Sequence, residues 1–252
     1  MATERLDVWL VQNGYFESRE KARFAIQSGV VQVNGQIAAK PAQATLEDDT
    51  VVLLGDSLRY VSKGGLKLEK AIQTFQLDFN GAVVLDIGAS TGGFTDCALQ
   101  HGAKQVFAID VGSDQLHPSL QNRPEITSIE GLNVRHLKAE HLNNHIADII
   151  VIDVSFISLA QVFPHIGEFL TPEGYVVGLI KPQFEMGFKR RVKKGIIKDE
   201  QIRAMILERI REYASENGFE LTDHTPTDAD GQEKNVEFMA LFYRKKLVLG
   251  VD

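Results

Sequence analysis

In the first fifty residues the apolar positions recur with two different periods, one typical of a helix and one typical of a strand. The apolar residues of RLDVWL recur at helical spacing, and Asn13-Gly14 supplies a stop signal, so we predict a short helix before that pair. Ser18 can cap a second helix, which Gly29 ends. The alternating run VVQVNG then predicts a strand closed by a turn at Asn34-Gly35. This segment reads as a small α+β domain.

Beyond residue 80 the pattern changes to continuous apolar runs separated by glycine-rich turns. The run GAVVLD ends at Asp86, a glycine-rich loop and a helix follow, and the run QVFAID ends at Asp110. Later runs end at Asp153 and Lys181, and a last strand lies near Glu237, so we expect these three ionisable residues to close three strands at the ligand edge. Apolar runs of this length that alternate with helices are typical of a parallel sheet covered on both faces. We therefore predict an α/β, Rossmann-like domain.

Together these patterns predict two domains. We place an S4-like α+β domain at residues 1–59, a linker at 60–66 and a Rossmann-like methyltransferase domain at 67–252, for reasons given below. The length of 252 residues is sufficient for a small and a medium domain, each with its own core.

Composition narrows the function classes. The formal net charge of −7 means that any nucleic-acid site must be a local basic patch. A single cysteine allows no intrachain disulfide and no cysteine-rich zinc site, and the histidines form no metal-like group, so we expect no metal. The start of the chain lacks the pattern of a signal peptide, and no apolar run is long enough for a membrane span. We expect a cytoplasmic protein without membrane contact.

Basic residues gather at the start of the second predicted helix. A solvated helix face is the simplest interpretation of such a cluster. However, the order of elements in RLDVWLVQNGYFESREKARFAIQSGVVQVNG resembles the S4 RNA-binding fold. This resemblance implies that Arg5, Arg19, Lys21 and Arg23 contact RNA phosphates.

The loop after Asp86 matches two unrelated patterns only partly. Its order, GASTGG, does not fit G-x-G-x-x-G. GASTG fits the G-x-S-x-G pattern of hydrolases, but such an enzyme needs an acid and a histidine downstream, and His224, which follows LTD, has no clear oxyanion-loop partner. An acid before such a loop and an acid closing the next strand resemble the S-adenosylmethionine site of Rossmann-like methyltransferases. Asp110 would bind the ribose diol, and Asp86 would orient the loop or meet the amino group indirectly; the alternative for both is a strand-end turn residue. The predicted cofactor-binding residues are Asp86, Gly88, Ser90, Gly92, Gly93, Phe94 and Asp110.

The segment DVSF after the fourth strand indicates the acceptor. Methyltransferases that act on base amino groups usually carry Asn or Asp, two prolines and an aromatic residue there, so this sequence argues against amino-group methylation. A ribose 2′-hydroxyl must lose its proton as the methyl group arrives. A lysine accepts that proton only in its neutral form, which burial and a second ammonium group favour.

The motifs SKGGLKL, DIGASTGGFTD, DVSFISL, KPQFE, KKGIIKD and VEF occur in the order found in the TlyA family, which joins an S4 domain to an FtsJ-like ribose 2′-O-methyltransferase. The resemblance implies methyl transfer from S-adenosylmethionine to ribosomal RNA, with Lys67, Asp153, Lys181 and Glu237 as the catalytic set. For Lys67, local sequence alone favours an exposed helix lysine. The sequence departs from the family where Lys234 replaces a glycine, so the loop before Glu237 could differ in shape.

Two further points stay open from sequence. The basic run after Lys181 is either a solvated loop or an RNA clamp, in which the phosphate contacts would be Lys189, Arg190, Arg191, Lys193 and Lys194. The alternatives to an enzyme are a non-catalytic RNA-binding or ribosome-assembly factor and, because the family carries a haemolysin label, a membrane-active protein. No export signal, span or clear amphipathic basic helix supports the last alternative.

Overall fold

The computed structural model forms two compact units, Met1–Lys63 and Gly64–Asp252. It describes residues 3–16, 18–27, 29–38, 40–46, 48–53, 59–186, 196–197, 199–227 and 235–245. Helix α3 (Lys63–Phe75) begins inside the segment that we assigned to the linker. The limits 1–59, 60–66 and 67–252 remain predictions.

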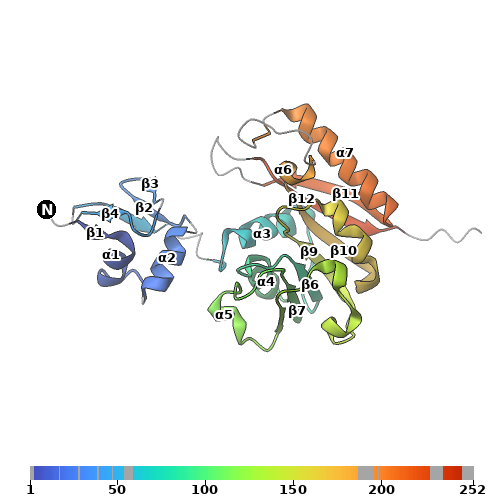
Figure 1. The fold of residues 1–252 in the computed structure, drawn as a ribbon, viewed down its shortest axis with the longest axis horizontal. Coiled ribbons are helices and arrows are strands. Elements are labelled where there is room, and N and C mark those ends of the chain that lie inside the picture. The colour runs from blue at the N-terminus through green and yellow to red at the C-terminus, as the bar shows by residue number, and fades with distance from the viewer. Residues whose placement is uncertain are drawn as a thin grey trace, which may run out of the picture. The chain divides into compact units, whose positions relative to one another are not determined.

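The first unit pairs two helices with short strands (Figure 1). Its elements are β1 (Glu4–Arg5), α1 (Leu6–Gln12), α2 (Arg19–Gln27), β2 (Val31–Val33), β3 (Gln36–Ile37), β4 (Ala44–Thr45) and β5 (Val51–Leu53). Helix α1 ends just before Asn13, as predicted. Asn34 and Gly35 both have positive φ, 53° and 77°, which a tight hairpin turn between β2 and β3 requires. Strands β3, β2 and β5 form a three-stranded sheet. Buried Leu6, Leu10 and Ile26 of the two helices share one core with valines of β2 and β5.

Seven strands of the described chain form one sheet in the second unit, in the order β11-β12-β10-β9-β6-β7-β8. The strands are β6 (Val83–Ile87), β7 (Gln105–Ile109), β8 (Ile126–Ile129), β9 (Ala147–Ile152), β10 (Leu170–Ile180), β11 (Phe219–Pro226) and β12 (Phe238–Arg244). The helices besides α3 are α4 (Gly93–Gln100), α5 (Pro118–Gln121), α6 (Pro182–Glu185) and α7 (Glu200–Glu216). The 3₁₀ turns are η2 (Val134–His136), η3 (Ala139–Leu142), η4 (Leu159–Gln161), η5 (Phe163–His165) and η6 (Gly167–Phe169).

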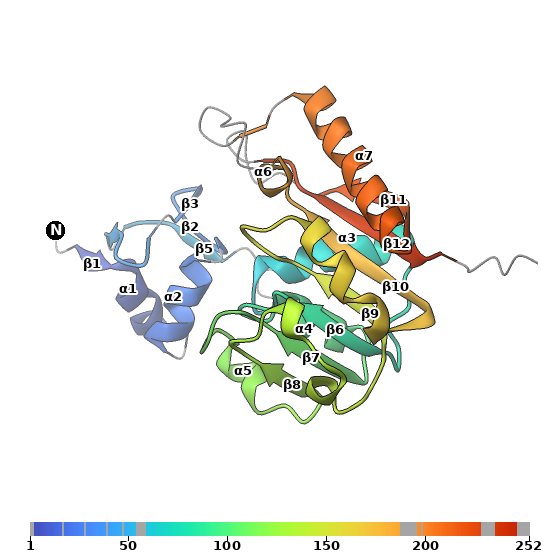
Figure 2. The ribbon, with the colours of Figure 1, turned by 45° about the vertical axis from the view of Figure 1, so that its right-hand side comes forward.

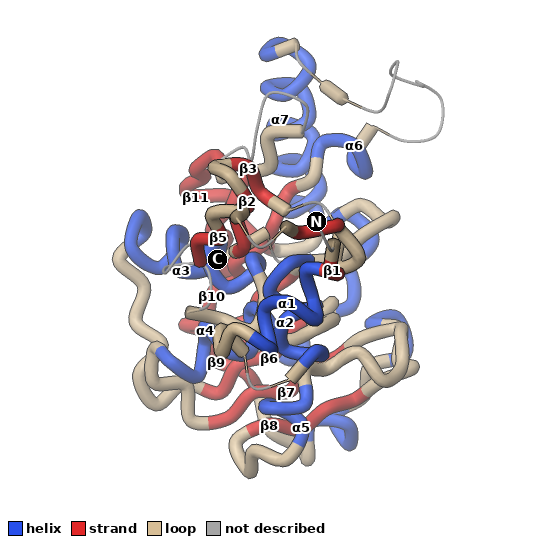
Figure 3. The backbone as a smooth tube through the Cα atoms, turned by 90° about the vertical axis from the view of Figure 1, so that its left-hand side faces the viewer, coloured by secondary structure: helices blue, strands red, loops and turns tan. Residues whose placement is uncertain are grey.

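Helices lie along this sheet at both ends. Helix α7 runs beside β11, and α4 lies against β6 and β7 (Figures 1 and 2). Figure 3 shows β7, β8 and α5 gathered at the other end of the sheet from β11. The interior strands are buried on both faces: Leu85, Ile150 and Val176 have no exposed surface. This explains why their sequences read as continuous apolar runs, and the predicted α/β fold is confirmed.

Strand direction decides which side chains reach the ligand edge. Strands β7, β6, β9 and β10 are parallel. The chain adds β7 and β8 on one side of β6 and then β9 and β10 on its other side, so the strand order reverses between β6 and β9. Ligands of such sheets bind at the carboxyl ends of the strands beside this switch point. Strand β12 runs antiparallel to β10. Glu237 therefore reaches the same edge by preceding β12, whereas we had expected it to close a strand.

No helix within the described ranges is both long and apolar enough to cross a membrane.

Candidate active site

The loop between β6 and α4 is shaped by residues with left-handed backbones. Gly88, Ser90 and Gly92 have φ values of 85°, 47° and 90°. A β-carbon on Gly88 would lie 2.5 Å from the backbone oxygen of Asp153, so only glycine allows this loop to pass against the end of β9. The loop is thereby placed directly beside a predicted catalytic residue.

Gly92 and Phe94 serve packing in this structure. A β-carbon on Gly92 would come within 2.5 Å of the Leu120 side chain and 2.7 Å of that of Leu116. Phe94 is 3% exposed. Gly93 is buried as the first residue of α4. Their predicted contact with a cofactor stays a prediction, and their burial offers a packing explanation for the same residues.

Asp110 follows β7 and is held by the neighbouring loops. Its Oδ2 atom accepts a hydrogen bond from the Ser90 amide at 2.8 Å, and Oδ1 accepts one from the Gly112 amide at 2.7 Å. The carboxylate is half-buried beside the glycine loop. A fixed, negatively charged acceptor in this place fits a ribose diol.

Asp86 is fully buried and linked to α4. Its Oδ2 atom accepts a hydrogen bond from the Thr95 hydroxyl at 2.6 Å. Burial raises the pKa of Asp86 to about 7, and the nearby charges of Asp153 and Asp110 add to that rise. This position supports the prediction that Asp86 orients the loop.

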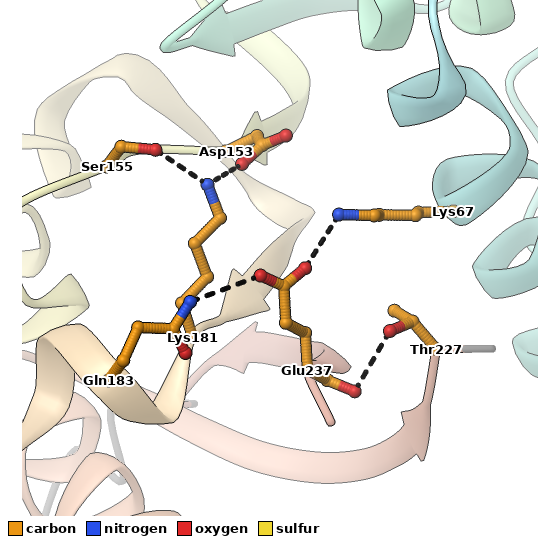
Figure 4. A network of polar contacts seen from close by, with 7 residues as sticks. All are labelled: Lys67, Asp153, Ser155, Lys181, Gln183, Thr227 and Glu237. Carbon is orange, nitrogen blue, oxygen red and sulfur yellow. Dashed lines mark hydrogen bonds and ion pairs between the residues drawn. The ribbon is translucent and has the colours of Figure 1, made fainter. Parts of the chain in front are cut away.

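The four predicted catalytic residues form two lysine–carboxylate pairs (Figure 4). The Nζ atom of Lys67, on α3, lies 2.6 Å from Oε2 of Glu237. The Nζ atom of Lys181, after β10, lies 2.5 Å from Oδ1 of Asp153. The Lys181 side chain is the most enclosed of the four at 11% exposed, and that of Lys67 is the least enclosed at 30%. Lys67 is thus paired with a distant residue, unlike a solvated helix lysine.

Three residues that the sequence did not indicate complete this network. Besides this ion pair, Lys181 donates a hydrogen bond to Oγ of Ser155, at 2.9 Å. The Gln183 side chain, two residues after Lys181, donates to Oε1 of Glu237 at 3.4 Å. The backbone oxygen of Glu237 accepts a hydrogen bond from the Thr227 amide at 2.8 Å and one from the Thr227 hydroxyl at 3.2 Å, and Figure 4 draws the second. Ser155 and Gln183 help to fix the side chains of Lys181 and Glu237, and Thr227 holds the backbone of Glu237. Serine, glutamine and threonine are too common in loops for their sequence to reveal this role.

Phe156 follows Ser155 in the chain and is unusual in both its exposure and its backbone conformation. It is 84% exposed, and its φ of 67° is unusual for a bulky residue. Its ring centroid lies 5.2 Å from that of Phe184 on α6. An exposed aromatic ring in a strained backbone next to a polar cluster is a candidate ligand contact.

In the first unit, two of the predicted RNA contacts already hold a carboxylate. Arg5 donates to both oxygens of Asp7 at 2.9 and 3.0 Å, and Arg19 donates to Oδ2 at 3.1 Å. Asp7 is fully buried, and the hydrogen bond from Arg5 is the main reason that its pKa falls to about 2. The trio keeps one net positive charge. Arg23 is exposed. The Lys21 side chain lies outside the described parts of the chain, as do Lys189, Arg190, Arg191, Lys193, Lys194 and Lys234.

The hydrolase interpretation of GASTG does not fit the sheet. Ser90 follows β6, whereas His224 lies on β11, four strand positions away. At roughly 4.8 Å per position the separation is about 19 Å, far beyond hydrogen-bond reach.

Comparison with known proteins agrees with this geometry. A family model described as FtsJ-like methyltransferase matches residues 60–244, and one described as S4 domain matches residues 4–51. Hemolysin A of Brachyspira hyodysenteriae is 41% identical over 94% of this chain and 99% of its own. The 16S/23S rRNA (cytidine-2'-O)-methyltransferase TlyA of Mycobacterium tuberculosis is 37% identical over 93% of this chain and 87% of its own. A solved structure from Streptococcus thermophilus, provisionally named a hemolysin, is 38% identical, with a TM-score of 0.76 over 98% of this chain and 90% of its own.

The strand order and the edge site are therefore those of a Rossmann-like methyltransferase that follows an S4 domain. The chain belongs to the FtsJ-like methyltransferase family, and the resemblance to the TlyA family predicted from its motifs is confirmed.

Proposed function

We propose that the protein is an S-adenosylmethionine-dependent methyltransferase that acts on ribose 2′-hydroxyls of ribosomal RNA. The observation that carries this proposal is the meeting of two lysine–carboxylate pairs at the sheet edge where the glycine loop passes Asp153. The name of the Mycobacterium tuberculosis relative makes cytidine the first nucleotide to test. Because ribosomal RNA is the substrate, the proposal also implies a cytoplasmic location.

The residues around the glycine loop fit the cofactor. Asp110 offers a carboxylate for the ribose diol, and Gly88 lets the loop pass directly against the end of β9 at Asp153, where any side chain would collide with the backbone. When bound, S-adenosylmethionine supplies an electrophilic methyl group on a positively charged sulfur. We assign Asp110, Gly88 and Ser90 to direct contact, and Asp86 to holding the loop and α4 in place.

The lysine–carboxylate pairs would act on the acceptor hydroxyl. Asp153 orients the Lys181 amine at 2.5 Å, and in its neutral form this amine would accept the 2′-proton as the C–O bond forms and the methyl–sulfur bond breaks. Lys67, held by Glu237 at 2.6 Å, would place a second positive charge near the oxygen that is becoming an ether. Each carboxylate orients its lysine, and Gln183 adds a hydrogen bond that helps to orient Glu237.

Phe156 would contact the base of the acceptor nucleotide. Its exposed ring lies one residue from Ser155, which is bonded to Lys181, so a base stacked on Phe156 would leave its ribose near the amine. A nucleotide must leave the RNA helix to reach such a site, and stacking on an aromatic ring offsets part of that cost.

The S4 domain would dock on folded RNA. Arg5 and Arg19 share one carboxylate and retain a net positive charge, and Arg23 is exposed on the same helix as Arg19. We propose these arginines, Lys21, and the basic residues Lys189–Lys194 as phosphate contacts, which position RNA without reading its sequence.

Methyl transfer from labelled S-adenosylmethionine to bacterial ribosomal subunits tests the proposal. Subunits should come from cells that lack the gene, so that the target positions are unmodified. The proposal expects label on a ribose 2′-oxygen. Cofactor binding without transfer to any subunit would favour the non-catalytic assembly factor instead, and vesicle leakage caused by the purified protein would favour membrane activity.

A further inference from the structure

Glu185 is a buried acid for which the reaction outlined above has no use. It is the last residue of α6 and is 8% exposed. Its Oε1 atom accepts a hydrogen bond from the Leu159 amide at 3.0 Å, and Oε2 accepts one from the Ser158 hydroxyl. Both donors lie where the active-site loop Asp153–Ser158 meets η4, and Ser158 in turn accepts a hydrogen bond from the Ala160 amide at 3.1 Å as the cap of η4.

Helix α6 therefore holds the loop Asp153–Ser158 at both of its ends. Lys181, the residue that precedes α6, binds Asp153 and Ser155 at the start of the loop. Glu185, four residues later, binds Ser158 at its end. Phe184, between them, contacts the ring of Phe156 in the middle. One turn of helix thus determines the position of the whole loop.

The loop needs such anchors because its backbone is strained. A left-handed conformation such as that of Phe156, with φ of 67°, costs roughly 1–2 kcal/mol for a residue other than glycine. Without attachments on both sides, the loop could relax and turn the ring away. The anchors keep the exposed ring beside the Lys181–Asp153 pair.

A carboxylate at position 185 is a costly choice if packing were its only purpose. Burial raises the pKa of Glu185 above its ordinary value, since an enclosed charge loses hydration. An apolar side chain of similar size would fill the space without that cost. What it could not do is accept two hydrogen bonds from the loop.

We propose that Glu185 is a positioning residue that fixes the loop Asp153–Ser158 on α6 and thereby sets the place where the acceptor nucleotide binds. This inference rests on the proposed function for the identity of the acceptor. It extends that function by assigning control of acceptor binding to a residue that touches neither substrate nor cofactor.

The test compares the full chain with Glu185→Ala, Glu185→Gln and Ser158→Ala. Glutamine keeps an oxygen for the Leu159 amide and a group that can donate to Ser158, so it should rescue what alanine loses. Ser158→Ala removes one anchor with little change in volume, which guards against a Glu185→Ala variant that fails to fold. Glu168→Ala is the matched control, because Glu168 is exposed and makes no side-chain hydrogen bond in the part of the chain that is described.

We expect Glu185→Ala to raise the KM for ribosomal subunits roughly ten-fold, since a lost buried hydrogen bond costs about that factor, with cofactor affinity within about two-fold of the wild type. Ser158→Ala should show a smaller rise, and Glu185→Gln should be close to the wild type. An unchanged KM in Glu185→Ala would overturn the inference. So would a parallel loss of cofactor affinity, or a glutamine variant as impaired as the alanine variant.

Amide hydrogen exchange tests the same inference without activity. In Glu185→Ala the amides of Leu159 and Ala160 should exchange faster, while those of Gly88 and Ser90 should not change. If wild-type protein transfers no methyl group, the proposed function fails, but this exchange pattern still decides whether Glu185 anchors the loop. Unchanged exchange at Leu159 and Ala160 would refute the anchoring itself.

Discussion

Replacing Lys181 by methionine separates a chemical role of this lysine from a structural one. Methionine keeps much of the length of the side chain and removes the charge. Breaking a fully buried ion pair costs about 3–5 kcal/mol. The Asp153 side chain is 23% exposed as a whole, but its paired Oδ1 atom is buried and would lose its partner, so we expect a loss of about 1–3 kcal/mol in the free energy of unfolding. A positioned proton acceptor contributes roughly 10²–10⁴-fold in rate, so methyl transfer should fall at least about a hundred-fold.

Single-turnover transfer to ribosomal subunits measures that rate free of product release. Lys181→Met should bind cofactor normally, and a double variant with Asp153→Asn should be no slower than the slower single variant, because the pair acts as one unit. Lys104→Met is the control, since Lys104 is exposed and its side chain has no partner among the residues described. A Lys181→Met protein within about ten-fold of the wild-type rate would refute the proposed role in proton transfer.

Three other residues give separate predictions. The pKa of Asp86 is about 7, against an ordinary value of 3.8. Between pH 3.8 and 7 the folded state therefore keeps a proton on Asp86 that the unfolded state has released. The free energy of unfolding should fall by roughly 4 kcal/mol as pH rises through this range. Denaturant titration at pH 4 and 8 should show this fall in the wild type and lose it in Asp86→Asn. The pKa of Asp7 is about 2, so the stability that its ionised form adds to the first unit should be present above pH 4 and lost as pH falls toward 2. Asp7→Asn should lower the free energy of unfolding of this unit by about 1–2 kcal/mol. The fluorescence of Trp9, the one tryptophan of the chain, reports this unfolding. Phe156→Ala should raise the KM for ribosomal subunits roughly five-fold or more without changing cofactor affinity, because stacking on a base contributes about 1–3 kcal/mol, and an unchanged KM in steady-state transfer would exclude this contact.

The parts of the fold that the sequence predicted are those in which a local signal and burial coincide. Strands β7, β9 and β10 are apolar runs that stop just before a charged residue, so both the element and its end could be identified, whereas β6 continues one residue beyond Asp86 to Ile87. Strands β8 and β11 and helix α7 were not predicted. Strand β8 is short and only half-buried, and β11 alternates with polar residues at the edge of the sheet, so neither carries a continuous apolar run.

The site was predictable in its members and unpredictable in its contacts. Motif order brought Lys67, Asp153, Lys181 and Glu237 together, but which lysine pairs with which acid depends on strand direction. Glu237 meets Lys67 because β12 is antiparallel, and nothing in the sequence of that strand specifies its direction. The burial of Glu185 was also hidden, because KPQFE gives no local sign that its last residue bonds to a loop more than twenty residues earlier.

The position of the transferred methyl group tests the central claim most directly. Ribosomal RNA from cells with and without the gene can be digested to nucleosides and analysed by mass spectrometry, with cells that carry the Lys181→Met variant as a third sample. The account predicts a 2′-O-methylated nucleoside that is present only with the wild-type gene. A methyl group on a base, or identical nucleosides in all three samples, would contradict it.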